Sequence, residues 1–131
     1  MPITLTGFLR TVLYADIVFS TGGAVLMAAG ASCLSPLLAL PGALLAGAGL
    51  LLVPWVVALI VVVRRKTVPK IVLVDIAGIN LLWCAACFGL LAFGGITPNA
   101  LGIAFVAAQA LAVALLGVLQ LLGLRGATAA A

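Results

Sequence analysis

The sequence predicts an all-α membrane protein, a four-transmembrane-helix up-down-up-down bundle that forms a single domain over residues 1–131. The first observation behind this prediction is composition. Hydrophobic residues make up 67% of the chain and charged residues 6%, whereas about a quarter of a soluble domain is charged. The second is that the apolar residues form four long runs with short connections between them.

Each run is long enough to cross a bilayer as a helix, because ~30 Å of hydrocarbon requires roughly 20 residues at about 1.5 Å per residue. A backbone in lipid must satisfy its own polar groups, and the runs lack the alternation of barrel strands. Short connections favour antiparallel neighbours. The predicted helices therefore cover residues 12–31, 37–63, 71–93 and 100–124.

The first run shares one feature with a cleaved signal peptide, because Arg10 precedes it and small residues end it. However, Asp16 and Ser20 interrupt the run, and its length suits a complete span. We expect a retained helix, with cleavage as the alternative.

Basic residues define the orientation. They occur as Arg10, as a cluster over residues 64–70, and as Arg125, while the other two connections carry no charge. Short cytoplasmic loops concentrate Lys and Arg, so the cluster and both termini are predicted to be cytoplasmic. The net charge of +4 is scattered over helix ends, which indicates attraction to membrane lipids and excludes a nucleic-acid partner.

Small residues recur at four-residue spacing in two of the helices. Such seams let helix backbones approach closely in lipid, and they either close the bundle or join protomers of a homo-oligomer or a larger membrane complex. The first seam includes Asp16, Ser20, Ala24 and Ala28, and the second includes Ala100, Ala104, Ala108 and Ala112.

The first group of candidate binding residues is polar and lies near the predicted cytoplasmic ends. Asp16, Asp75 and Gln120 occur at similar depths, so they form one inner layer if their faces point inward. A charged residue within a membrane helix is costly, which makes it a functional candidate. Their role is either to hold a cation, proton or polar ligand head, or to anchor helix ends beside the basic residues.

The second group lies deeper. Gln109 and Asn80 are expected to bond across helices, either as a dry clamp or as part of a polar pocket walled by Trp83 and Trp55. Gln109 is eleven residues from Gln120, so the two glutamines share a face of the fourth helix at ~16.5 Å separation.

Catalysis is not expected. The sequence contains no His, no glycine-rich phosphate loop and no nucleophile with an adjacent base, so we predict no cofactor and no metal. Cys84 and Cys87 form a Cys-x-x-Cys pair, but near the middle of a regular helix such a pair is poorly placed for a disulfide. A thiol oxidoreductase is therefore the third-ranked function.

Three segments, ADIVFS (residues 15–20), INLLW (79–83) and TPNALGIAFVAAQALAV (97–113), give the chain a resemblance to a known group. The sequence is similar to an uncharacterised group of small bacterial four-helix inner-membrane proteins. The resemblance implies a multi-pass topology in the bacterial inner (plasma) membrane, and it assigns no functional residue.

The function that these features favour is that of a small non-enzymatic membrane protein. It would act as an accessory module or bind a lipid-like ligand through helix packing and its inner polar layer. The alternative is a minimal ion or small-solute transporter that uses Asp16 and Asp75.

Overall fold

Four long helices dominate the computed structural model, which describes residues 2–130 and the side chains of residues 2–127. Each is long and apolar enough to cross a membrane, so the predicted four-helix membrane fold is confirmed and the chain is a multi-pass membrane protein. The helices are α1 (Gly7–Ala29), α3 (Gly42–Val63), α4 (Lys70–Phe93) and α5 (Ala100–Ala130).

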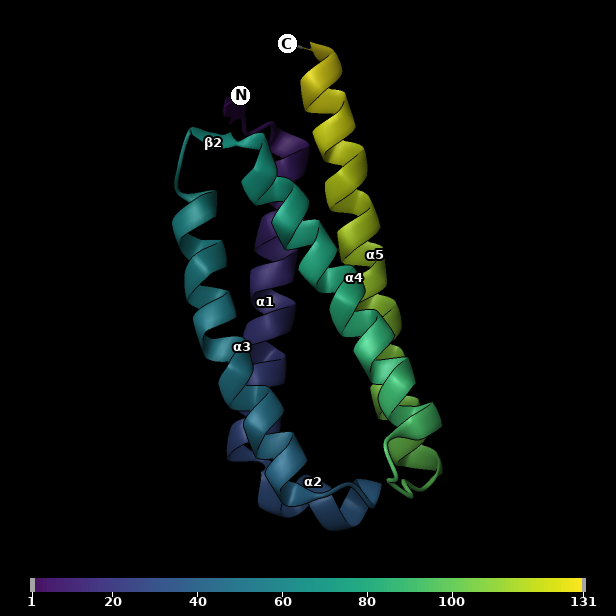
Figure 1. The fold of residues 1–131 in the computed structure, drawn as a ribbon. Helices are drawn as coiled ribbons and strands as arrows, with labels where there is room; N and C mark the ends of the chain where they lie inside the picture. Colours follow the sequence, from purple (N-terminus) through teal and green to yellow (C-terminus); the bar gives the residue numbers. More distant parts are fainter. Residues whose placement is uncertain (1, 131) are drawn as a thin grey trace.

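The helices pack as two antiparallel pairs, α1 with α3 and α4 with α5 (Figure 1). Contacts between α1 and α5 join the pairs, whereas α3 and α4 hardly touch although they are consecutive in the chain. The bundle is therefore more open on the side between α3 and α4 than a closed four-helix bundle.

A short helix at the end of the molecule opposite both termini was not predicted. Helix α2 (Ala31–Leu38) follows a break at Gly30, and it occupies the position where the sequence predicted the end of the first helix, an outer turn and the start of the second helix. Helix α3 consequently begins five residues after its predicted start at residue 37. It lies across the open ends of the two helix pairs (Figure 1). The Asn99 side chain fastens α2 to the start of α5 by donating to the Leu37 carbonyl at 2.8 Å.

At the other end, two short strands that were also not predicted tie the helix pairs together. Strand β1 (Pro2–Thr4) pairs antiparallel with β2 (Thr67–Pro69), with Ile3 opposite Val68. Because β1 leads into α1 and β2 leads into α4, the two helices begin at the same level. Helix α1 consequently starts five residues before its predicted start.

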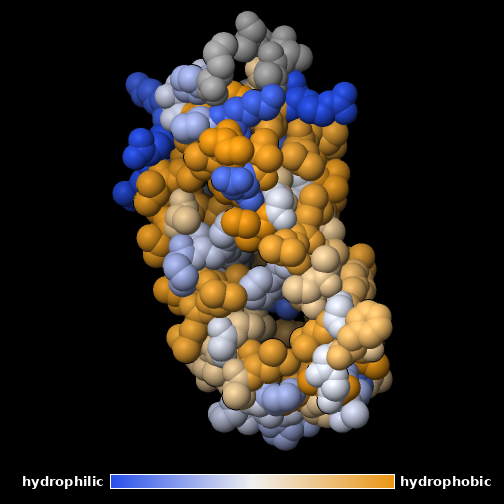
Figure 2. Space-filling view, viewed as in Figure 1, coloured by the Kyte–Doolittle hydropathy of each residue, from blue (hydrophilic) through white to orange (hydrophobic). Residues whose placement is uncertain are grey.

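Basic side chains gather at this same end of the molecule. Figure 2 shows a hydrophilic band there, above a surface that is mostly apolar. Arg10 donates to the carbonyl of Val63 and to that of Arg65 (3.3 Å), which satisfies acceptors at the end of α3. The separation of a charged end from an apolar girdle matches the lipid-facing surface of a membrane helix bundle.

Small residues let the backbones approach within the first helix pair. A side-chain carbon added at Gly49 of α3 would lie 2.5 Å from the Ala28 nitrogen and 2.9 Å from the Ala24 carbonyl oxygen of α1. The seam on α1 therefore helps to close the bundle. The seam on α5 differs, because Ala100, Ala104 and Ala108 are exposed.

Candidate functional site

Four polar side chains form a buried hydrogen-bonded cluster in the centre of the bundle, which we call the polar network. The Asp16 carboxylate is fully buried and accepts three hydrogen bonds. Its Oδ1 accepts from Ser20 Oγ at 3.0 Å, and its Oδ2 accepts from Asn80 Nδ2 and from Gln120 Nε2, both at 2.8 Å. Asn80 Nδ2 also donates to Gln120 Oε1 at 3.0 Å.

The strand pairing explains why these residues meet. Asp16 is nine positions after the first residue of α1 and Asn80 is ten positions after the first residue of α4. At about 1.5 Å per residue, both lie ~14 to 15 Å along helices that start at the same level. Helix α5 runs antiparallel to α4 and brings Gln120 to this depth.

Asp75 lies elsewhere. It is five residues nearer the start of α4 than Asn80, which at about 100° per residue turns it to another face of the helix. Its side chain is exposed on the outside of the bundle and makes no contact with the polar network. The predicted inner layer of Asp16, Asp75 and Gln120 is thus replaced by Asp16 and Gln120 with Ser20 and Asn80, deeper than expected.

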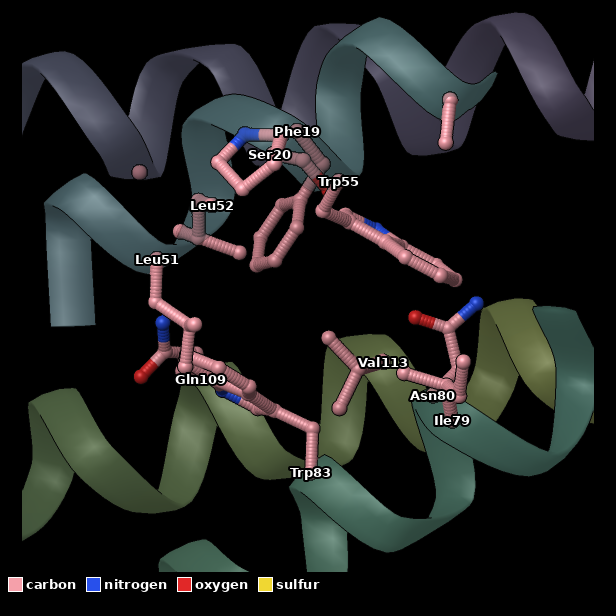
Figure 3. Close-up of a pocket in the computed structure, with 13 residues that line it drawn as sticks. Phe19, Ser20, Leu51, Leu52, Trp55, Ile79, Asn80, Trp83, Gln109 and Val113 are labelled. Atoms are coloured by element: carbon pink, nitrogen blue, oxygen red, sulfur yellow. The ribbon is translucent and has the colours of Figure 1, made fainter.

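A cavity of about 440 Å³ adjoins the polar network and lies between the two helix pairs. Figure 2 shows an opening in the apolar surface in the view that faces α3 and α4. Trp55 of α3 and Trp83 of α4 contribute the two largest lining side chains (Figure 3). The remaining lining residues are Phe19, Ser20, Gly23, Leu51, Leu52, Pro54, Ala58, Ile79, Asn80, Gln109 and Val113.

Ser20 and Asn80 connect the cavity to the polar network, because both line the cavity and both hydrogen-bond to Asp16. The Asn80 nitrogen is used by the network, and its carbonyl oxygen turns toward the cavity (Figure 3). Within the described chain this oxygen accepts no hydrogen bond. Every fully buried polar side-chain atom of the described residues has a hydrogen-bond partner, so an oxygen without one is not fully buried. The Asn80 oxygen is therefore accessible from the cavity.

The two tryptophans of the cavity also carry polar groups that make no hydrogen bond within the described chain. Neither indole N–H donates a hydrogen bond to another described residue, and neither is sealed from its surroundings. An indole N–H in an apolar setting usually finds an acceptor. Trp55 and Trp83 thus offer unused donors as well as large apolar walls.

Gln109 does not meet Asn80. The two residues lie at opposite ends of the cavity in Figure 3, so the predicted Asn80–Gln109 clamp is wrong. Asn80 bonds to Asp16 and Gln120 instead, while the Gln109 amide makes only long contacts with sulfur, to Met27 Sδ at 3.9 Å and Cys87 Sγ at 4.0 Å. The pocket between Trp55 and Trp83, the other arrangement that the sequence allowed, has Asn80 at one end and Gln109 at the other.

Two further hollows meet at Gln109. One of about 800 Å³ lies between α1 and α5 and includes Gly22 and Phe105, and one of about 160 Å³ reaches Met27 and Cys87. Both are almost entirely apolar. Of these three hollows, the cavity between Trp55 and Trp83 is the one that residues of the polar network line.

All three cysteines are free. Cys33 is exposed on α2, whereas Cys84 and Cys87 lie on α4, half-buried and buried respectively. Among the described residues, no group of three or more His, Cys, Asp or Glu side chains is placed to hold a metal ion.

Sequence reasoning missed Ser20 as a member of the site, although its position four residues after Asp16 places both on one face of α1. Phe19, Leu51, Leu52 and Val113 were also missed, because nothing distinguishes an apolar lining residue from a lipid-facing one in the sequence.

Comparisons of the chain with protein-family models, with curated proteins and with solved structures found no match.

Proposed function

We propose that this protein is a non-enzymatic membrane module that binds a lipid-like ligand in the cavity between its two helix pairs. The observation that carries the proposal is the shape and lining of that cavity. Its volume of about 440 Å³ falls in the range of small-molecule sites, and apolar walls surround a few convergent polar atoms. A site of this composition suits a molecule with an apolar chain and a small polar head.

The position of the cavity suggests how a ligand arrives. It lies between helices that span the membrane, on the side where α3 and α4 hardly touch. A ligand dissolved in the bilayer can therefore enter sideways, without passing through water. This route supports a lipid-like molecule over a water-soluble one.

The basic residues at one end of the molecule support an orientation of the protein in the membrane. We place the protein in the bacterial inner membrane with the end that carries the basic residues in the cytoplasm, because Lys and Arg concentrate on that side. The exposed small residues of α5 support association with a partner helix, either from a second copy or from a larger membrane complex.

Transport of an ion or proton is the second candidate, and one observation favours it. Asp16 is a fully buried carboxylate within a membrane span, and no basic side chain contacts it in the described chain. Flux in liposomes that is lost in Asp16→Asn and kept in Asp75→Asn would support transport. Equal flux in both variants and the wild type would remove Asp16 from any transport mechanism.

Native mass spectrometry from a mild detergent tests the ligand-binding proposal. The wild-type protein is expected to carry a non-covalent lipid mass. Ala58→Phe places a ring in the cavity and is expected to remove this mass, while Val57→Phe, on the exposed neighbouring position, is expected to keep it. An adduct that is absent from all three proteins, or equal in all three, would contradict the proposal.

A further inference from the structure

Resting on the proposed function, we infer that the ligand of the cavity is a single-chain amphiphile with a cationic ammonium head. The head binds at the end formed by Ser20 and Asn80, beside Asp16, and the chain lies along Trp55 and Trp83. Hydrogen bonding, charge and aromatic lining each point to this class of head.

The polar atoms of Ser20 and Asn80 that the network leaves free are acceptors. Asn80 Nδ2 donates to Asp16 and to Gln120, which leaves only its carbonyl oxygen for a guest. The Ser20 hydroxyl donates its proton to Asp16, so only the lone pairs of its oxygen remain to bind a guest, as acceptors. A head that binds to Ser20 and Asn80 must therefore donate hydrogen bonds, as an ammonium or a hydroxyl does and a carboxylate does not.

Charge then separates the ammonium from the hydroxyl. Oδ2 of Asp16 accepts two amide N–H groups and Oδ1 contacts the Ser20 hydroxyl, and donors of this kind stabilise a negative charge on the carboxyl group. A head bound to Ser20 or Asn80 is separated from this negative charge by one side chain. In a low-dielectric interior this proximity attracts a cation and repels an anion.

Among the described residues, no positively charged side chain lines the cavity. Its lining residues are apolar, aromatic or neutral, and the basic residues Arg64, Arg65, Lys66, Lys70 and Arg125 are exposed at the cytoplasmic end proposed above. An anionic head would lose its hydration without gaining a cationic partner. Such a head would find neutral donors, such as the indole N–H groups of Trp55 and Trp83, but no positive charge, so the cavity disfavours it.

The aromatic lining adds to the preference. Trp55, Trp83 and Phe19 all line the cavity, and the faces of aromatic rings attract cations, tryptophan most strongly. The rings also supply apolar walls for the first part of a hydrocarbon chain. Figure 3 shows Asn80 at one end of the space that these rings border.

The test uses the intrinsic fluorescence of the protein. Trp55 and Trp83 are the only tryptophans in the chain and both line the cavity, so tryptophan fluorescence reports on this site. The protein is reconstituted in zwitterionic nanodiscs and titrated with three probes of equal chain length, dodecylammonium, dodecanol and dodecanoate. The partition of each probe into protein-free nanodiscs corrects for binding to the lipid surface.

Dodecylammonium is expected to give a saturable change with a Kd about tenfold below that of dodecanol, and dodecanoate no saturable change. In Asp16→Asn the tenfold preference for the ammonium probe is expected to fall to about twofold, because the charge is removed and only the aromatic lining still favours the cation. Asp75→Asn, which neutralises the only other acidic side chain on an exposed face, is the matched control and is expected to keep the tenfold preference.

Equal binding of ammonium and alcohol by the wild type, or tighter binding of dodecanoate, would overturn the inference while leaving the cavity as a lipid site. The same holds if Asp16→Asn keeps the tenfold preference. Absence of saturable binding by all three probes would overturn the proposed function as well. The comparison of head groups on the wild type needs no variant, so the inference is falsifiable even if Asp16→Asn does not fold.

Discussion

Replacement of Asn80 by leucine is expected to destabilise the protein, because it removes a side chain that bonds to two of the other three members of the polar network. Two hydrogen bonds are lost, to Asp16 at 2.8 Å and to Gln120 at 3.0 Å. Hydrogen bonds between membrane helices average ~0.6 kcal/mol and reach ~1.7 kcal/mol, so Asn80→Leu should lower the free energy of unfolding by about 1 to 3 kcal/mol. The buried Asp16 carboxylate, left with fewer donors, moves the expected value toward the upper end.

The assay is reversible unfolding in mixed micelles, followed by far-UV circular dichroism and analysed as a free energy of unfolding. Gln109→Leu is the matched control, since it makes the same change at an amide whose only contacts are with sulfur at 3.9 and 4.0 Å. The control is expected to lose less than about 0.6 kcal/mol, the average for one interhelical hydrogen bond. Equal losses in Asn80→Leu and Gln109→Leu would refute the network as a stabilising unit.

Two other predictions concern helix packing and orientation. Gly49→Val should lower the free energy of unfolding by about 1 to 3 kcal/mol or more, because the new side chain meets the backbone of Ala28 on α1. Gly47→Val is the control, since a side-chain carbon at Gly47 meets nothing within 4 Å. Equal unfolding free energies of the two variants would contradict the close approach of α1 and α3. Cys33 is exposed on α2 at the end opposite the basic residues, so a membrane-impermeant maleimide should label it from the periplasmic side of intact cells, and labelling from the cytoplasmic side alone would reverse the proposed orientation.

The main helices could be predicted from the sequence because apolar length alone identifies a membrane span. The predicted segment 71–93 and the observed α4 differ by a single residue at one end. The unpredicted elements depend on weaker or non-local features. The break at Gly30 that separates α2 from α1 falls within the last turn of the predicted first segment, and no proline or charge marks it. The strand pairing of Ile3 with Val68 joins residues 65 positions apart.

Three of the four residues of the polar network could be predicted from the sequence, but their arrangement could not. The side chains of Asp16, Asn80 and Gln120 could be selected because polar residues in lipid-spanning helices are costly. Their common depth could not be obtained, because it depends on where α1 and α4 begin, and the β1–β2 pairing fixes those starts. A predicted helix start at residue 12 made Asp16 look level with Asp75, whereas the start at Gly7 makes it level with Asn80.

The central claim is that the cavity between the helix pairs holds a lipid-like ligand. Photo-crosslinking tests this claim most directly, with a neutral single-chain lipid that carries a diazirine on its chain. After irradiation in membranes, mass spectrometry of peptides locates the adducts. The account predicts adducts concentrated at Trp55, Trp83 and Val113 of the cavity wall, and their loss in Ala58→Phe. Adducts spread over outward-facing residues such as Val61 and Leu82, with no enrichment in the cavity and no change in Ala58→Phe, would contradict it.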